Sequence, residues 1–339
     1  MSKKRSSKRA GGVQRDAQGR AHLVIQRDGY GREAGLALSQ PLFRDRWQDD
    51  VAVAVAAKAH AMLGEGHTPA QAAALGRDAM AATSKIVDGA LAQSPDRPPA
   101  CRAGCAHCCH QAVGVTPPEV LAIHEHLRAT RTADELTAFA ARLRIADDRT
   151  RGLTPAQRQS PEFPCPFLVD ARCSIYEVRP LSCRGTNSLD AAACERNLHD
   201  PTSRAAFLAG EVGTPCYLEP FRASHAVTAG LQMALDQLHG LEVVPLELTA
   251  AMRIMLDEPD AVPQAWLGGK DPFAAARGAD TTDDPRIREL SGRRLIATPH
   301  KQKPPCGGFC MGGLAWGAYA LIAVSSPGFL MPGVPAESV

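Results

Sequence analysis

Residues 101–109 read CRAGCAHCC and place Cys101, Cys105, Cys108 and Cys109 within nine positions. Thiolates are soft ligands, which select zinc, copper(I) and iron–sulfur clusters. In a loop that enters a helix, such close spacing can turn several sulfurs toward one centre. A bound metal then replaces the apolar core that a region of short elements lacks. The four cysteines therefore predict a metal site, and that site decides how this part of the chain folds.

The adjacent pair Cys108 and Cys109 complicates a single tetrahedral site, because neighbouring side chains do not easily reach one ion together. Either one of them does not bind, or the pair belongs to two centres or to a multi-iron cluster. Some of the cysteines could also be ordinary buried thiols, since free cysteine packs well. The spacing Cys-x3-Cys-x2-Cys also matches the pattern with which radical-SAM enzymes hold a four-iron cluster. Such sites follow a strand in a βα barrel, and this chain shows no repeated strand–helix alternation.

Further candidate ligands surround this group. His107 and His110 lie within or next to the cluster and could complete a mixed Cys/His zinc site, although lone histidines are more often surface or core residues. His124 shares the apolar face of a predicted helix, which favours packing over ligation. Cys194 and Cys216 stand alone and are interpreted as buried thiols or weak additional ligands.

The composition favours a reducing compartment and gives no sign of nucleic-acid binding. The chain has 38 basic and 36 acidic residues, a formal charge of +2 and 45% hydrophobic residues. Its positive charge is concentrated in the first 20 residues, which predicts a polar arm. No apolar stretch follows that arm, so we expect no secretory signal peptide and a cytoplasmic location, where clustered cysteines are ligands rather than disulfides.

Helical periodicity dominates the rest of the chain. Two helices separated by a break at 64–69 predict a helical hairpin, and the apolar face of the first is expected at Val51, Val55 and Met62. Two capping boxes, Thr116 with Glu119 and Thr132 with Glu135, each open a further helix. Residues 161–184 are punctuated by proline and predict a small hairpin or an irregular loop. Two more amphipathic helices are expected around 227–238 and 248–255.

The expected fold is mainly α, an irregular helical domain with a small β-hairpin or loop region around a cysteine-ligated metal site. Five segments are predicted: a basic, unstructured arm at 1–40, a helical hairpin at 41–95, the cysteine-cluster domain with trailing helices at 96–240, a helical and irregular region at 241–303, and an uncharged Gly/Pro-rich tail at 304–339. The tail contains the two-ligand fragment Cys306-x3-Cys310. Its apolar run, 314–324, is too short for a membrane span of about 20 residues, so no membrane partner is expected.

The motifs resemble a known family. Residues 101–109, the helix that begins at TPPEV, PCPFL at 164–168 and RCSIYEVRPLSCR at 172–184 together look like the YkgJ-like cysteine-cluster family, a zinc- or iron-chelating domain, over roughly 97–185. The resemblance implies a zinc or iron cofactor, with an iron–sulfur cluster as one form. It also implies one family cysteine set: Cys101, Cys105, Cys108, Cys109, Cys165, Cys173 and Cys183.

The same resemblance assigns Tyr176, Arg179, Pro180 and Arg184 to the motif. A cationic neighbour lowers the pKa of a thiol, so Arg179 and Arg184, which flank Cys183, could offset the charge of a multi-thiolate site. The chain departs from the family at the hairpin tip, where Asp170-Ala171-Arg172 replaces the usual Gly or Asn. Alanine tolerates positive φ poorly, so a different turn is expected there.

The functional hypothesis is a metal-binding protein that chelates zinc or iron. Some larger relatives of this family are protein lysine N-methylases, so the first alternative is an iron–sulfur-dependent enzyme of that kind. The second is a zinc-stapled interaction module, whose protein partner the sequence does not name. No Ser-His-Asp pattern, paired-carboxylate motif or HExxH supports a hydrolase, and no GxGxxG or P-loop supports nucleotide binding.

Overall fold

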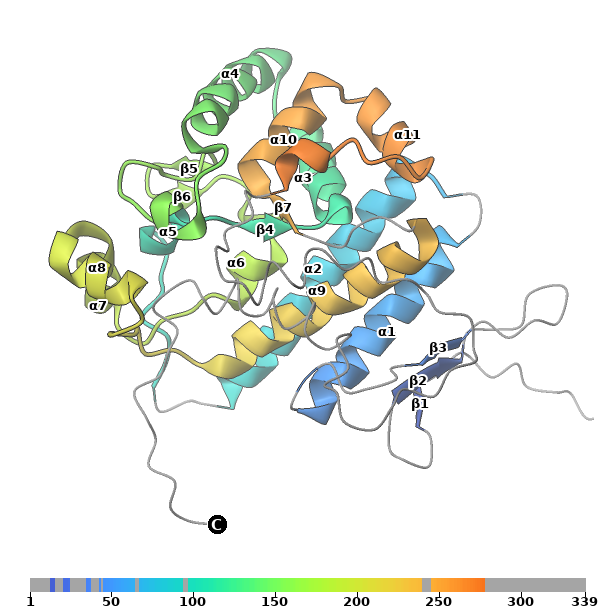
Figure 1. Ribbon diagram of the computed structural model, residues 1–339, viewed down its shortest axis with the longest axis horizontal. Coiled ribbons are helices and arrows are strands. Elements are labelled where there is room, and N and C mark those ends of the chain that lie inside the picture. The colour runs from blue at the N-terminus through green and yellow to red at the C-terminus, as the bar shows by residue number, and fades with distance from the viewer. Residues whose placement is uncertain are drawn as a thin grey trace, which may run out of the picture.

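The structure is a computed structural model that describes residues 13–15, 21–24, 35–37, 43, 45–64, 67–93, 97–239 and 245–277. Long helices make up most of it, and its sheets are small and antiparallel (Figure 1). The expected mainly α class with a small hairpin is therefore confirmed. The described strands of the first 40 residues, β1 (Val13–Arg15), β2 (Ala21–Val24) and β3 (Gly35–Ala37), pair in that order, in a segment where composition predicts an unstructured arm.

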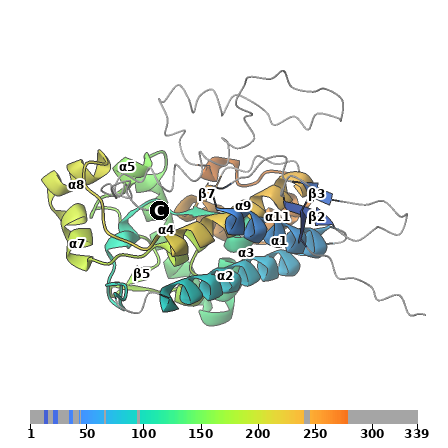
Figure 2. The same ribbon diagram turned by 90° about the horizontal axis from the view of Figure 1, so that it is seen from below.

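Three long helices pack together: α1 (Arg46–Leu63), α2 (Pro69–Ala92) and α9 (Leu218–His239). They contact one another, and α9 runs along both partners in the two views (Figures 1 and 2). The helix α2 begins at Thr68, whose hydroxyl oxygen accepts from the backbone N–H of Gln71 in a capping box. At Gly230 of α9 a Cβ atom would collide with the backbone of Ala52, so the missing side chain permits the close approach of α1.

The predicted inward face of α1 is displaced by about one residue. Ala52, Val53 and Ala56 are fully buried, whereas Val51, Val55 and Met62, the expected face, are half-buried against the same core. Because many positions of α1 are small apolar residues, the sequence periodicity does not distinguish the buried face from its neighbours. The faces predicted for α9 and for the helix around 248–255 are confirmed, since their apolar residues are almost fully buried.

Two helices, α3 (Pro117–Thr130) and α4 (Ala133–Thr150), follow the cysteine loop. Both predicted capping boxes form, and the Glu119 carboxylate accepts from the N–H of Thr116 at 2.8 Å. α3 packs on α2, and α4 packs on α10 (Leu248–Asp257). The helix α11 (Ala261–Leu267) and the 3-10 turn η3 (Ala274–Ala276) complete the described chain.

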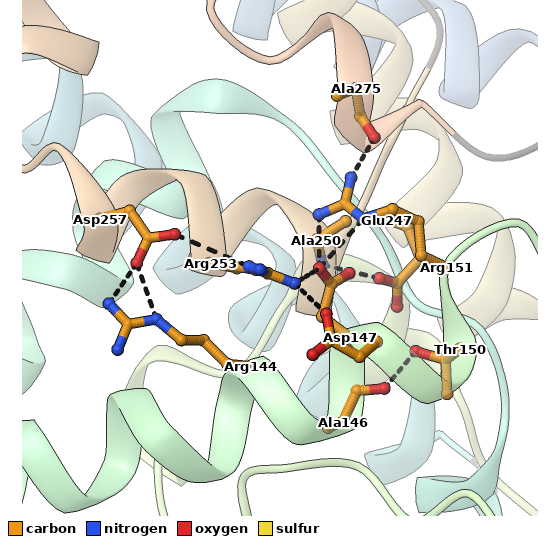
Figure 3. A network of polar contacts seen from close by, with 11 residues as sticks. Arg144, Ala146, Asp147, Thr150, Arg151, Glu247, Ala250, Arg253, Asp257 and Ala275 are labelled. Carbon is orange, nitrogen blue, oxygen red and sulfur yellow. Dashed lines mark hydrogen bonds and ion pairs between the residues drawn. The ribbon is translucent and has the colours of Figure 1, made fainter.

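An ion network fixes α10 on α4 (Figure 3). The fully buried carboxylate of Asp147 accepts from Arg151 at 2.5 Å and from Arg253 of α10 at 2.9 Å. Arg253 also pairs with Asp148, and Arg144 pairs with Asp257 at 2.6 Å. Arg151 and Arg253 both pair with this buried carboxylate, so only removal of both would leave it without a cation, and such a loss is strongly destabilising.

The region between α4 and α9 consists of short elements. They are α5 (Pro155–Arg158), the hairpin β5 (Leu168–Val169) and β6 (Arg172–Cys173), the 3-10 turn η2 (Tyr176–Val178), α6 (Leu181–Gly185), α7 (Ala191–His199) and α8 (Pro201–Leu208). The predicted hairpin is confirmed. The expectation for its tip is wrong: Asp170 and Ala171 both have positive φ, 50° and 57°, so alanine occupies a left-handed position in a two-residue turn.

Buried apolar side chains from residues 53–276 form one cluster, to which α1, α2, α3, α4, α9 and α10 all contribute. A two-residue strand, β4 (Gly114–Val115), pairs with β7 (Leu246–Glu247) and links the cysteine loop to the chain after α9. Among the residues the structure describes, no helix is both long and apolar enough to cross a bilayer. The predicted apolar run 314–324 and the Cys306-x3-Cys310 fragment lie outside those residues.

Candidate metal centre

The first cysteine group lies on a tight loop that ends in the 3-10 turn η1 (His107–His110). Gly104 has φ 89°, a conformation that glycine adopts freely, and the N–H of Cys105 bonds to the carbonyl of Arg102 at 2.9 Å. The N–H of Cys109 bonds to the carbonyl of Ala106 at 2.9 Å. These two turns bring three cysteines of the loop, Cys101, Cys105 and Cys108, to the wall of one pocket.

The second group is attached directly to the first. The backbone N–H of Cys165 donates to the carbonyl oxygen of Cys109 at 2.7 Å. Cys173 lies on β6, opposite Leu168 in the hairpin register, and Cys183 lies in α6. The loop and the hairpin, far apart in sequence, are thus joined through the main chain. The hairpin β5–β6 lies toward the same side of the molecule as α7, and α6, which carries Cys183, lies closer to the centre (Figure 1).

Electrostatic coupling shows which thiols are neighbours. Burial is the main cause that raises the pKa of Cys183, and the thiols of Cys165, Cys108 and Cys173 raise it further. The pKa of Cys101 is raised first by burial and then by Cys108 and Cys105. Cys108 therefore interacts with members of both groups. Burial also raises the pKa of Cys165 to about 12.

The adjacent pair has two different environments. Cys108 lines the pocket, and its pKa is raised chiefly by a hydrogen bond with the Cys109 side chain and then by burial. Cys109 does not line the pocket; its carbonyl oxygen holds Cys165 instead. A 3-10 turn separates neighbouring side chains by about 120°. This geometry places only one of the pair at the pocket wall.

Cys194 joins the cluster, although the sequence sets it apart. It lies in α7 and lines the same pocket, of about 70 Å³, as Cys101, Cys105 and Cys108. Its pKa is raised by burial and by those three thiols, and lowered by a hydrogen bond with Ser188. Its distance from the other cysteines follows no ligand spacing, so only the fold reveals it. Cys216 is buried and lies outside the pocket lining.

The three candidate histidines also differ in whether they line the cysteine pocket. His107 lines the pocket, and its ring makes an edge contact with His199 of α7, with 6.2 Å between centroids. The Nδ1 atom of His110 lies 3.2 Å from the carbonyl of Ala106, and burial is the main cause that lowers its pKa. His124 lies on α3, where it is 7% exposed and lines a different pocket.

The positive charge of Arg179 acts on four thiols of the two cysteine groups. Its charge lowers the pKa values of Cys101, Cys108, Cys173 and Cys183, all of which burial or a neighbouring thiol raises more strongly. Its guanidinium stacks on Tyr176, 4.6 Å from the ring centroid. Arg184 donates to the carbonyl of Arg179 at 2.9 Å and to Ser84 at 2.6 Å. Neither arginine forms an ion pair with a carboxylate of the described residues, although the charge of Glu119 acts on Arg184.

Glu119 is a positioning residue that the sequence shows only as a helix cap. Its side chain is 1% exposed, and its second oxygen accepts from the N–H of Leu181 at 2.8 Å. That bond fixes the start of α6, two residues before Cys183. Gly185, at the other end of α6, packs against Ser224 of α9 where a Cβ would collide. The short helix that carries Cys183 is therefore fixed at both ends.

The donor set fits a soft metal ion chemically. All nine cysteines of the described residues are free thiols, and seven of them belong to the set that the family resemblance implies. Within those residues, no three His, Cys, Asp or Glu side chains converge closely enough to hold an ion as they stand. Raised thiol pKa values mean that the sulfurs hold protons, which a metal must displace. Ligation would require the side chains to close around the pocket.

Comparison with curated proteins and with solved structures finds no match. Residues 100–201 match a family model, CxxCxxCC, described as "Putative zinc- or iron-chelating domain". The matched segment contains every cysteine of the two groups, and it extends past the expected boundary at 185 to include Cys194. Residues 100–201, less than a third of the chain, are thus similar to a cysteine-cluster domain described as zinc- or iron-chelating.

Proposed function

We propose that this protein binds zinc or iron through the thiolates of its two cysteine groups. The observation that carries the proposal is the pocket whose wall holds Cys101, Cys105, Cys108 and Cys194. Four thiolates are the donor set of structural zinc sites and of iron–sulfur clusters. Such a metal would supply a soft cation that holds the loop, η1 and α7 together.

The second group extends the ligand set. Cys173 and Cys183 interact with Cys108, Cys165 interacts with Cys173 and Cys183, and Cys109 is bonded to Cys165 through the main chain. We therefore assign the metal ligands to Cys101, Cys105, Cys108, Cys109, Cys165, Cys173 and Cys183, with Cys194 added. Eight sulfurs exceed the needs of one tetrahedral ion, which favours two centres or one multi-iron cluster.

The local charge supports a divalent metal. Every added thiolate increases the negative charge of the site, and Arg179 is the cation that four of the thiols share. A metal dication bound by four thiolates carries a net charge of about −2, which Arg179 and Arg184 offset in part. These arginines would lower the net negative charge of the site and would not bind the metal themselves.

The test is anaerobic purification of the full chain, followed by metal analysis and an absorption spectrum. Stoichiometric zinc in a colourless protein, or iron with broad visible absorption, supports the proposal and distinguishes its two forms. Cys105→Ser with Cys108→Ser should remove most of the metal, whereas Cys216→Ser should retain it. If the metal-free protein folds equally well and the double variant keeps the metal content of the wild type, the proposal is wrong.

A further inference from the structure

A second pocket lies away from the cysteines, where α3 faces α10 and α11. Its volume is about 560 Å³, within the range of small-molecule sites, roughly 300–1,000 Å³. Leu121 of α3 and Met255 of α10 give it an apolar floor, and three prolines extend that surface. Both Leu121 and Met255 are almost fully buried. The pocket is thus built by the folded core and not by surface loops alone.

A buried polar side chain faces into this pocket. His124 is only 7% exposed and lines the pocket, yet it forms no hydrogen bond within the described chain. Neither ring nitrogen of His124 is among the fully buried side-chain atoms that lack a partner, so the ring is open to a hydrogen bond from a bound molecule. His124 lies one turn before Arg128 on the same face of α3. The two side chains therefore present a hydrogen-bonding group and a cation along one wall.

An acidic side chain also lines this pocket. Asp260 precedes α11, lines the same pocket, and interacts electrostatically with His124, as Arg128 does. Neither Arg128 nor Asp260 has an ion-pair partner among the residues described. Glu125, the remaining charged residue of the lining, is already paired with Arg77 of α2. The pocket lining thus includes one cation and one anion without an ion-pair partner among the described residues, beside an apolar floor.

We propose that this pocket binds a small zwitterion of the α-amino-acid class. Its carboxylate pairs with Arg128, and its ammonium group pairs with Asp260. The apolar side chain of the ligand lies on Leu121 and Met255, and His124 accepts or donates a hydrogen bond at the base. An anion alone would leave Asp260 unpaired beside it, and a cation alone would leave Arg128 unpaired.

The experiment measures binding to the full-length protein by isothermal titration calorimetry with L-leucine, L-methionine and L-phenylalanine. At least one should bind saturably, and its N-acetyl derivative and its amide should each bind at least about tenfold more weakly. No saturable binding by any of the three overturns the proposal. Equal binding of the N-acetyl derivative overturns it as well, because the site would then recognise only an anion.

Two variants and two matched controls complete the test. Arg128→Gln and Asp260→Asn alter exposed side chains and should each weaken binding of the amino acid by about tenfold or more. Lys85→Gln and Glu258→Gln make the same charge changes at exposed positions outside the pocket lining and should leave the affinity unchanged. Wild-type affinity in either pocket variant contradicts the proposal. Cys105→Ser should retain amino-acid binding, since the pocket is independent of the metal site.

Discussion

The backbone N–H of Cys165 donates a 2.7 Å hydrogen bond to the carbonyl oxygen of Cys109. This bond joins the loop of the first cysteine group to the segment that leads into the hairpin. A change of geometry in one group is therefore transmitted to the other through the main chain, without any shared ligand.

The two groups should consequently lose metal together. Cys173→Ser, in the hairpin, should lower the metal content of the whole protein by about half or more, because the hairpin closes on the first group. Metal analysis of the anaerobically purified variant measures this. A variant with full metal content would show that the first group binds independently.

Cys194 and Cys216 form a matched pair of isolated cysteines. Cys194 lines the pocket and interacts with Cys101, whereas Cys216 lies outside it. We expect Cys194→Ser to lower metal affinity by at least about tenfold, the effect typical of losing an important group at a metal site. Cys216→Ser should not change it. Competition with a chelator measures both, and equal affinities for the two variants would exclude Cys194 as a ligand.

Gly185 determines the distance between α6 and α9. Gly185→Ala places a methyl group against Ser224 and the backbone of Pro220, so we expect a loss of about 1–3 kcal/mol in the free energy of unfolding. Displacement of α6 should also reduce metal binding at Cys183. Gly89→Ala in α2, which meets no atom within 4 Å, is the control and should be neutral or stabilising. Similar urea midpoints for both variants would contradict the close approach.

Ala171 occupies a strained position at the hairpin tip, with φ 57°. Ala171→Gly should raise the free energy of unfolding by about 1 kcal/mol, because glycine adopts this conformation without the steric cost of a Cβ atom. Ala141→Gly, at an exposed position in α4, should have the opposite sign and about the same size. Denaturant unfolding distinguishes them, and destabilisation by Ala171→Gly would mean that the turn is of another type.

His225 should make the protein sensitive to mild acid. Burial lowers its pKa from 6.5 to about 4, and its ring packs against Phe221 with 4.0 Å between centroids. Between these two pH values the unfolded chain binds a proton at His225 that the folded chain does not. The free energy of unfolding therefore falls as pH decreases through this window, by about 2 kcal/mol between pH 6.5 and 5.

The measurement compares unfolding at pH 7 and pH 5 in the wild type and in His225→Gln. The variant should lose about 2 kcal/mol less than the wild type over this interval. Loss of metal at low pH affects both proteins, so it cancels in the difference. Identical pH dependence in the two proteins would assign the acid sensitivity to other groups.

The helices and their starts were readable from the sequence because local rules determine them. Both capping boxes form where Thr and Glu are three residues apart, and the strongly periodic faces of α9 and α10 are buried. Small alanines on α1 made its inward face ambiguous. At the hairpin tip the surrounding pairing determined the turn and overrode the preference of Ala171.

The candidate site was less predictable because it depends on contacts between distant segments. Cys194 has no ligand spacing, and Glu119 looks like an ordinary cap although it also holds Leu181. The two-residue strands β4 and β7 are too short to produce a periodic pattern. The pocket beside His124 requires α3 and α11 to come together, which no local rule predicts.

The strand pair β4–β7 has a further consequence for how this domain can be used. The matched segment ends at residue 201, yet Val115 pairs with Leu246, and the apolar face of α3 is covered by α2 and α10. A fragment cut at residues 100 and 201 would expose that face to water and invite aggregation. The smallest autonomous folding unit in this protein is therefore larger than the family segment it contains, and transplanting the metal site requires its helical surroundings as well.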